Sequence, residues 1–433
     1  MAKITAQRGT MDITPKDIYK WQYVEKTARD VAARYGFSEI RVPTFEATEL
    51  FLRGVGDTTD VVQKEMYTFE DKGGRSITLR PEGTAGIARA MIENSLYGTS
   101  LPLKLYYILN CFRYEKPQAG RTREFTQFGV ELFGSESPMA DAQVIALVDT
   151  LLKELSIKNI TLELNSIGCK NCRPKFNEAL IKYFSQYKDK LCPTCLSRLE
   201  KNPLRILDCK SEVCIQIAKN APTGLEFICE ECSSHFESVK NALSSMNIDY
   251  VINPKIVRGL DYYTKTVFEF VSNNIGAQGT VCGGGRYDGL VEELGGPKMC
   301  GIGFGLGISR LIMLMENTNV NFPLPSKCSL YIGSMGEKAS LKSMEIAKNL
   351  RAEGYYVEED IMDRGVKAQM KYANKIGASY SVVIGDTELS QDKALIKDME
   401  TGDQKEIILS DICSEFTKII LDKHQKDILD TKF

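Results

Sequence analysis

Apolar residues recur at helical spacing over two long stretches of the chain, and shorter stretches have the character of strands. In residues 16–35 they repeat every three or four positions, which predicts a helix that ends at Gly36. Residues 139–155 repeat in the same way, and a shorter helix is predicted at 85–94. Strands are predicted at residues 37–42, 78–79, 161–165, 250–252 and 266–272. The first three quarters of the chain therefore mix strands with helices.

A proline-bearing segment, residues 319–327, separates this pattern from a more regular one and is the clearest domain boundary. Beyond it strands and helices alternate, which indicates an α/β domain of roughly 100 residues. Its predicted strands are residues 330–332, 355–357, 380–384, 394–396 and 406–409. Its predicted helices are residues 338–351, 367–376 and a last helix that Ser410 could cap.

Residues 168–247 have a different character, because they are rich in cysteine, charged and mostly helical in pattern. Eight of the 13 cysteines of the chain lie in this segment, as three CxxC pairs and one looser pair: Cys169 and Cys172, Cys192 and Cys195, Cys229 and Cys232, Cys209 and Cys214. Eight thiols are enough for two tetrahedral Cys₄ zinc sites. Reduced or partly oxidised thiols are the alternative, and which pairs would share a metal does not follow from the sequence.

Composition narrows the class of protein. The 433 residues, 43% hydrophobic and 26% charged, are those of a soluble globular protein with more than one domain. No run approaches the roughly 18 apolar residues of a membrane helix, and the N-terminus lacks the apolar core of a signal peptide, so we expect a cytoplasmic protein with no membrane partner. The net charge of −2 argues against a surface covered with nucleic acid but leaves room for local basic patches.

The most informative segment is residues 112–134, two strand-like runs joined by a loop that is rich in Pro, Gly and Arg. Alternate positions of the two runs share one face of the predicted hairpin: Arg113, Glu115, Gln127, Gly129 and Glu131. Arg121 and Arg123 lie in or beside the loop. Such a face suits a small zwitterion together with a polyphosphate, although an antiparallel hairpin with a solvated polar face has the same spacing.

Three further segments carry possible chemistry. In residues 301–307 every second residue is glycine, so one face of a strand would have no side chains and a flat ligand or another backbone could approach it closely. Arg310 follows in the first turn of an apolar helix. The glycines of residues 279–285 could cradle an anion with their backbone N–H groups, or form a plain hairpin loop. Residues 258–263 place an arginine and two tyrosines near one turn, which alone is an ordinary polar loop.

In this order, these segments resemble the histidyl-tRNA synthetases, a family of class II aminoacyl-tRNA synthetases, over nearly the whole chain. Residues 36–43, 112–134 and 301–310 resemble the three motifs of the class, the first of which forms the dimer interface. Residues 258–263 and 279–289 resemble two stretches peculiar to the histidine enzymes. The resemblance implies a homodimer that activates L-histidine with ATP to histidyl-adenylate and transfers it to tRNA(His).

The resemblance also implies an α+β fold. A catalytic domain built on an antiparallel class II sheet would span residues 1–322, interrupted by the helical Cys-rich insertion at 168–247. The linker at 319–327 would lead into an α/β anticodon-binding domain at 328–433. A metal in the insertion would be structural, because no ATP-site motif lies near the cysteines in sequence. The family as a whole does not depend on zinc.

Site residues carry over from the family position by position. Arg113 and Arg258 would hold the α-phosphate of ATP, Arg121 and Arg310 the β- and γ-phosphates, and Glu115 the adenine amine, with Mg²⁺ accompanying the nucleotide. The attacking histidine carboxylate is already anionic, so no general base is needed and catalysis becomes positioning and charge stabilisation. This fits a chain with only two histidines, neither of them in these segments.

The amino acid substrate needs its own partners. By the same resemblance its α-ammonium would meet Glu82, Thr84 and Gln127, its imidazole would meet Glu131 and Tyr263, and Tyr262 and Tyr287 would line the pocket with Arg258. Such a site should reject amino acids without imidazole nitrogens by roughly 10⁴ or more, since its buried polar groups would go unpaired.

One position departs from the family pattern. Ser309 stands where an acidic residue commonly precedes the arginine of the third motif, which puts in doubt any metal contact assigned there and leaves Ser309 free to cap the helix. Two rivals remain at this point. One is a regulatory paralogue that binds histidine without catalysis, and the other is a class II synthetase for proline, threonine or glycine.

Overall fold

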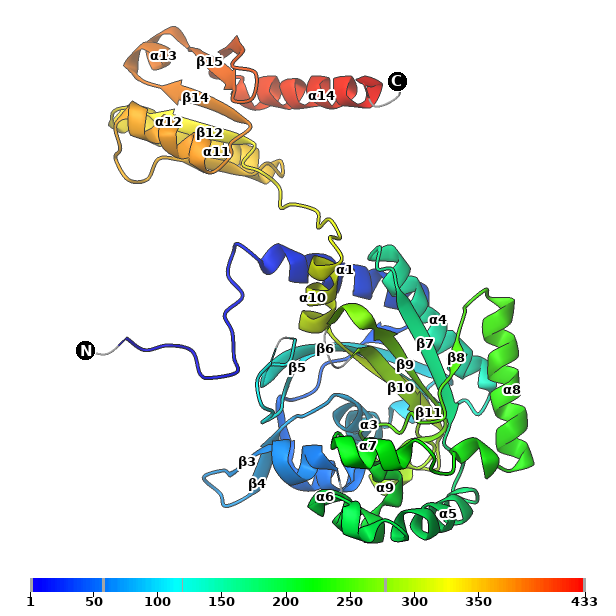
Figure 1. The fold of residues 1–433 in the computed structure, drawn as a ribbon. Coiled ribbons are helices and arrows are strands. Elements are labelled where there is room, and N and C mark those ends of the chain that lie inside the picture. The colour runs from blue at the N-terminus through cyan, green and yellow to red at the C-terminus, as the bar shows by residue number, and fades with distance from the viewer. Residues whose placement is uncertain (1–2, 57–58, 119, 276–278, 431–433) are drawn as a thin grey trace. The chain divides into compact units, whose positions relative to one another are not determined.

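The computed structural model describes residues 3–56, 59–118, 120–275 and 279–430. The chain divides into two compact units, Met1–Pro323 and Leu324–Phe433 (Figure 1). The division falls within the segment 319–327 that the sequence marks as a linker. In the described segments no helix has both the length and the apolar character needed to cross a lipid bilayer.

The first unit is built on an eight-stranded sheet. Its strands, in spatial order, are β1 (Ser38–Glu39), β5 (Leu103–Phe112), β6 (Glu124–Phe133), β11 (Gly301–Gly307), β10 (Thr280–Arg286), β9 (Thr264–Ser272), β7 (Ile160–Ser166) and β8 (Val251–Ile252). The two outermost pairs, β1 with β5 and β7 with β8, are parallel, and every pair between them is antiparallel. The predicted antiparallel class II sheet is confirmed.

Side chains of the sheet alternate between two apolar layers. One face, which includes Phe128 and Val130, packs against four helices: α1 (Ile18–Arg34), α4 (Pro138–Glu154), α8 (Glu230–Ser245) and α10 (Ile308–Asn317). The other face, which includes Leu105 and Tyr107, packs against α3 (Thr84–Glu93) and α9 (Leu290–Glu293). Burial of both layers fixes which face each strand residue occupies, because a shift by one residue would exchange the two faces.

A small second sheet lies beside the first in the same unit. It consists of β2 (Phe45–Ala47), β4 (Ser76–Leu79) and β3 (Tyr67–Glu70), with α2 (Thr48–Val55) following β2. Only part of β4 was predicted. The strand predicted at residues 37–42 is shorter than expected, since only the two residues of β1 pair with β5.

The first run of the predicted hairpin at residues 112–134 also needs correction. Strand β5 ends at Phe112, so Arg113 and Glu115 lie in the loop beyond it rather than on the strand face shared by Gln127, Gly129 and Glu131. The loop is held against the segment that leads into α3, because Arg113 Nε donates to the carbonyl of Pro81 at 2.8 Å.

The cysteine-rich segment forms a helical subdomain with its own apolar core. Its helices are α5 (Arg173–Ser185), α6 (Pro193–Lys201), α7 (Glu212–Ala218) and the long α8. Phe176, Leu180 and Phe184 of α5 pack there against Leu199 of α6. Helix α8 then returns to the catalytic sheet and packs on α4.

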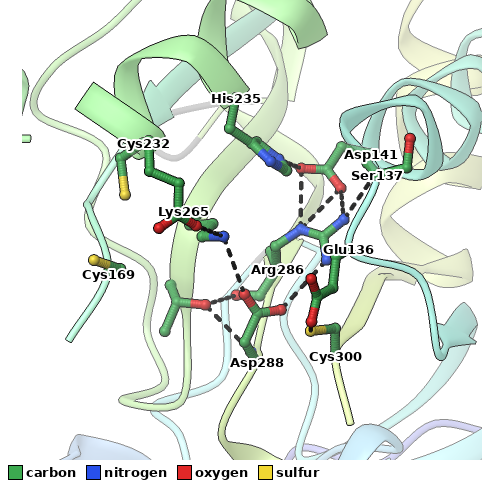
Figure 2. A network of polar contacts seen from close by, with 12 residues as sticks. Glu136, Ser137, Asp141, Cys169, Cys232, His235, Lys265, Arg286, Asp288 and Cys300 are labelled. Atoms are coloured by element: carbon green, nitrogen blue, oxygen red, sulfur yellow. Dashed lines mark hydrogen bonds and ion pairs between the residues drawn. The ribbon is translucent and has the colours of Figure 1, made fainter. Parts of the chain in front are cut away.

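A buried polar network ties α8 to the sheet. Figure 2 shows Arg286 of β10 and His235 of α8 converging on Asp141 of α4. Arg286 Nε donates to Asp141 Oδ1 at 3.0 Å, and His235 Nε2 lies 2.8 Å from Asp141 Oδ2. Arg286 and Asp141 are fully buried, so water could not take the place of either charged partner if the other were lost. The network therefore locks the return helix of the insertion onto the catalytic domain.

The second unit has a five-stranded mixed sheet. Its strands, in spatial order, are β13 (Val357–Glu359), β12 (Leu330–Ser334), β14 (Tyr380–Ile384), β15 (Lys393–Asp398) and β16 (Gln404–Ile408). Its helices are α11 (Glu337–Ala352), α12 (Val366–Lys375), α13 (Asp386–Gln391) and α14 (Ile412–Asp430). Helix α13 was not predicted. Ser410 does not cap α14; its hydroxyl donates to Asp392 Oδ2 at 2.7 Å.

Candidate active site

A cavity of about 870 Å³ lies over the central strands of the large sheet. Its walls come from the loop after β5, from β6, β9, β10 and β11, from the start of α10 and from the insertion. All five residues predicted to bind ATP line it: Arg113, Glu115, Arg121, Arg258 and Arg310. The four arginines and Lys210 give the wall five cationic side chains against three acidic ones, which favours a polyanionic ligand.

Arg258 is the most firmly positioned of these arginines. Its guanidinium forms an ion pair with Glu269 of β9, and Thr280 Oγ1 donates to the other oxygen of Glu269 at 2.6 Å. Gly283 of β10 lies directly against the guanidinium, so a Cβ at that position would overlap it. Arg205 of the insertion donates to the carbonyl oxygen of Arg258 at 2.8 Å. Sheet and insertion therefore hold this arginine from both sides.

The remaining arginines are less fully paired. Arg121 forms an ion pair with Glu115 at 3.1 Å across the loop. Among the described residues neither Arg113 nor Arg310 has an ion-pair partner, and Arg310 Nε, like Arg258 Nε, is buried without a hydrogen-bond acceptor. Burial and the nearby charge of Arg121 lower the pKa of Arg310. A bound anion would supply the acceptors that these guanidinium groups lack.

Behind the arginines, Glu131 of β6 is fully buried among hydroxyl groups. Thr84 Oγ1 donates to Glu131 Oε1 at 2.7 Å, Tyr107 OH donates to the same oxygen at 3.2 Å, and Tyr287 OH donates to Oε2. Burial raises the pKa of Glu131 to about 8, although the three hydroxyls oppose the shift. A bound hydrogen-bond donor or cation would therefore favour the charged form of this carboxyl group over its neutral form.

Tyrosine rings connect this carboxyl group to the arginine-lined cavity. The ring centroids of Tyr262 and Tyr263 are 4.6 Å apart, and those of Tyr262 and Tyr287 are 5.6 Å apart. The guanidinium carbon of Arg258 lies 5.8 Å from the ring centroid of Tyr263. The structure therefore brings together the residues predicted for imidazole recognition, next to the arginine predicted for the α-phosphate.

Glu82, predicted to meet the α-ammonium, has a structural role. Its two carboxylate oxygens accept the backbone N–H groups of Thr84 and Ala85, both at 2.7 Å, at the start of α3. Burial raises its pKa. Gln127 Oε1 accepts the N–H of Gly83 at 3.0 Å, and Gln127 also lines the cavity. These contacts hold the start of α3 beside the sheet; the ammonium role of Glu82 remains a prediction.

The alternating glycines of β11 make room for another backbone, as expected, and also for side chains of neighbouring elements. A Cβ on Gly303 would overlap the carboxylate of Glu131, and a Cβ on Gly301 would overlap the ring of Tyr287. The bare face therefore accommodates neighbouring side chains together with the backbone carbonyl of Val130, while Gly305 and Gly307 line the cavity, where the approach of a flat ligand remains a prediction. Glycine here clears the space in which the buried carboxyl group and its tyrosine partner sit.

Two local expectations are wrong. Residues 280–286 are neither an anion cradle nor a hairpin loop; they form the central strand β10, whose backbone pairs with both β9 and β11. Ser309 does not cap α10, because the cap position is Gly307 and Ser309 lies within the first turn, where it lines the cavity.

Sequence reasoning missed several residues of the site. Tyr107 and Glu269 come from β5 and β9, which show only ordinary strand patterns. A signal for Tyr107 did exist, since Gly129 lies directly opposite it in β6 and a Cβ there would overlap the Tyr107 ring. No sequence pattern marked Arg205 as a site residue, because the surrounding part of the insertion has no motif that relates it to the site.

Comparison with known proteins identifies the family. The model of a family described as histidyl-tRNA synthetase matches residues 9–171 and 210–311, and an anticodon binding domain matches 329–419. A histidine–tRNA ligase of Clostridium perfringens is 56% identical over 407 residues, 94% of this chain and 97% of that protein. The chain belongs to the histidyl-tRNA synthetase family. Members of this family activate histidine with ATP and transfer it to tRNA(His).

Further relatives agree with this family assignment. The histidine–tRNA ligase of Acetivibrio thermocellus is 54% identical over 94% of this chain and 98% of that protein. The crystal structure of apo S. aureus histidyl-tRNA synthetase superposes with a TM-score of 0.82 and 40% identity, covering 96% of this chain and 100% of that chain. The predicted recognition, fold class and enzyme class are confirmed.

The eight insertion cysteines fall into two groups of four. The base tetrad is Cys169, Cys172, Cys229 and Cys232, and the upper tetrad is Cys192, Cys195, Cys209 and Cys214. Within each tetrad all sulfur atoms lie within 4.8 Å of one another, and all eight thiols are free. The spatial grouping supplies the pairing that the sequence left open.

The geometry of both tetrads fits a tetrahedral metal. Sulfur–sulfur distances are 3.6 Å for Cys169–Cys172, 3.8 Å for Cys172–Cys232 and 3.8 Å for Cys192–Cys209. Zinc–sulfur bonds of about 2.3 Å give a tetrahedron with edges of about 3.8 Å, whereas a disulfide needs about 2.05 Å. The cysteines are distant from the ATP-site motifs along the chain, as expected, but they are not all distant in space, because Cys209 lines the cavity.

Proposed function

We propose that this chain is a histidine–tRNA ligase that forms histidyl-adenylate from L-histidine and ATP and transfers the histidyl group to tRNA(His). One observation carries the proposal: a single cavity gathers Arg113, Arg121, Arg258 and Arg310 and reaches Gln127, on the strand that holds Glu131. Family membership supports the overall reaction, and this geometry supports the residue roles.

In the first step a carboxylate oxygen of histidine attacks the α-phosphorus of ATP, and the bond from that phosphorus to the β-phosphate oxygen breaks to release pyrophosphate. Arg258 and Arg113 would neutralise charge on the α-phosphate, and Arg121 and Arg310 would hold the β- and γ-phosphates with the Mg²⁺ that accompanies ATP. Positioned cations of this kind stabilise the transition state without a protein nucleophile. Glu115 would release Arg121 and receive the adenine amine.

Histidine would bind with its α-ammonium near Glu82, Thr84 and Gln127. Its imidazole would reach Glu131 and Tyr263, beside the rings of Tyr262 and Tyr287. The high pKa of Glu131 suits this role, because one ring nitrogen of histidine can donate to the carboxylate or accept from the carboxyl group. The hydroxyls of Thr84, Tyr107 and Tyr287 would hold the carboxyl group in place in either state.

In the second step the terminal ribose hydroxyl of tRNA(His) attacks the carbonyl carbon of the adenylate, and AMP leaves. Among the residues that the structure describes no side-chain base is evident beside the reacting groups, so we propose that a phosphate oxygen of the adenylate takes the proton. The C-terminal unit would bind the anticodon, as its match to an anticodon binding domain supports. We further propose a cytoplasmic homodimer whose interface includes residues 36–43, which resemble the first class motif.

Amino-acid-dependent pyrophosphate exchange tests this function. The full-length chain with Mg-ATP is expected to exchange labelled pyrophosphate into ATP with histidine and to fall by roughly 10⁴ or more with amino acids that lack the imidazole. Exchange with proline, threonine or glycine instead would show a different synthetase. Histidine binding without exchange would identify a regulatory protein and contradict the proposal.

We also propose that both cysteine tetrads bind structural zinc. The sulfur geometry supports this, as do backbone N–H groups that donate to the sulfurs, such as Cys229 N to Cys172 Sγ at 3.1 Å. Such donors stabilise the thiolate charge that zinc binding requires. Elemental analysis of protein purified without chelator is expected to find about two zinc ions per chain. A content near zero, with eight titratable thiols, would exclude metal.

A further inference from the structure

The upper tetrad lies beside the proposed nucleotide site, not at a distance from it. Four consecutive residues at its edge, Leu207 to Lys210, line the cavity together with Ile215. Cys209 is both a member of the tetrad and part of the cavity wall. The insertion therefore supplies one side of the pocket that the catalytic arginines line on the other.

The chain between the two halves of this tetrad also contacts the catalytic domain directly. Arg198 donates to Asp60 Oδ2 at 2.8 Å and to the carbonyl of Arg205 at 3.2 Å. Asn202 donates to Asp261 Oδ1 at 3.1 Å. Arg205 in turn donates to the carbonyl of Arg258 at 2.8 Å. This segment, residues 196–208, thus forms a bridge from the tetrad to the backbone of the arginine proposed to hold the α-phosphate.

Arg205 is an unusual residue for such a bridge. Only 5% of its surface is exposed, and among the described residues it has no carboxylate partner within ion-pair distance. Within the described parts of the chain its only hydrogen-bond acceptor is the Arg258 carbonyl, and its Nε is buried without one, so the contact needs a rigid surrounding. Its neighbours Leu204 and Ile206 belong to the small insertion core, and so do Cys195 and Cys214. Small cores of this kind commonly need a metal to be rigid.

We propose that zinc held by Cys192, Cys195, Cys209 and Cys214 fixes residues 205–210, of which 207–210 form a wall of the nucleotide cavity, and so positions Arg258 for ATP. The inference rests on the proposed function for the identity of the nucleotide. Arg205 acts as a positioning residue, through the Arg258 backbone. The zinc itself takes no part in the reaction; it makes ATP affinity depend on whether four thiols of the insertion hold their metal.

The base tetrad provides a matched control. Its cysteines lie at the starts of α5 and α8, and none of the four is among the residues that line the cavity in the described parts of the chain. Figure 2 shows Cys169 and Cys232 of this tetrad near Lys265, on the side of the network that anchors α8. Loss of its zinc should loosen the insertion base while leaving the wall next to Arg258 in place.

The test compares Cys195→Ser with Cys232→Ser in the full-length chain. Both cysteines are buried, and each belongs to one tetrad. Zinc is measured by mass spectrometry of the metal content, and Mg-ATP affinity by calorimetry without histidine. Each variant is expected to lose about one zinc ion, but only Cys195→Ser should weaken ATP binding, by about tenfold or more. Equal ATP affinity in Cys195→Ser and the unaltered chain, despite lost zinc, would overturn the inference.

Arg205→Lys keeps the test decisive if Cys195→Ser does not fold. It should retain both zinc ions and still weaken ATP binding, because a lysine cannot reproduce the guanidinium contact to the Arg258 carbonyl. Unchanged ATP affinity in this variant would also overturn the inference. Since neither readout requires turnover, failure of histidine-dependent exchange in the unaltered chain would count against the proposed function alone.

Discussion

Replacing Arg258 by alanine is expected to lower histidine-dependent pyrophosphate exchange by about 10²–10³, the effect of losing one transition-state donor. Arg258 lies in the cavity wall, is aligned by Glu269 and Gly283, and has its backbone held by Arg205. If it neutralises charge that develops on the α-phosphate, kcat should fall more than the affinity for Mg-ATP. Steady-state exchange at varied ATP and histidine measures both quantities.

Two further variants separate this effect from damage to the fold. Arg258→Ala leaves Glu269 without its guanidinium partner, so the double variant Arg258→Ala/Glu269→Gln should remove the stray charge without restoring exchange. Arg75→Ala removes an arginine that pairs with Asp71 on an exposed turn, and it should leave exchange unchanged. Exchange within threefold of normal in Arg258→Ala would show that the phosphate role is misplaced.

Replacing Glu131 by glutamine is expected to lower kcat/KM for histidine by about 10²-fold, the consequence of leaving buried hydrogen-bonding groups unmatched. The substitution preserves size. One of the carboxyl oxygens that now accept hydroxyl donors becomes an NH₂ group, so at least one of Thr84, Tyr107 and Tyr287 loses its acceptor. The imidazole would lose a carboxyl partner that can be either charged or neutral.

The ATP side of the reaction provides the internal control for Glu131→Gln. Because the arginines line a different part of the site, Mg-ATP affinity should stay within about threefold of normal. Glu163→Gln makes the same chemical change on β7 of the same sheet, where Glu163 accepts from Asn253 at 2.7 Å, and should affect neither substrate. Equal losses of histidine and ATP binding in Glu131→Gln would indicate a misfolded sheet instead of a specificity residue.

The elements that the sequence predicted well are those whose burial is periodic. Helices α1 and α4 begin and end within two residues of the predicted bounds, since one stripe of each faces the core. Two of the missed elements lack such a stripe, whereas α2, which was also missed, has one formed by Leu50, Phe51 and Val55. Strand β3 is mostly exposed, and α13 has no buried residue, so no apolar pattern marked either of them.

Local pattern likewise placed individual site residues on their strands and turns. The alternation of Gln127, Gly129 and Glu131 on one face of β6 is a property of any extended chain, and it needs no tertiary contact. The resemblance of short motifs named the arginines and tyrosines of the site, and all the arginines so named line one cavity.

Contacts between segments distant along the chain could not be predicted in the same way. Strand order places β6 beside β11, and the insertion folds back so that Arg205 meets Arg258 and Cys169 lies 4.0 Å from Cys229. Periodicity reports which side of an element is buried, but it carries no information about the partner that buries it. Only the assembled sheet and the packed insertion decide those partners, because the choice of partner depends on burial over the whole domain.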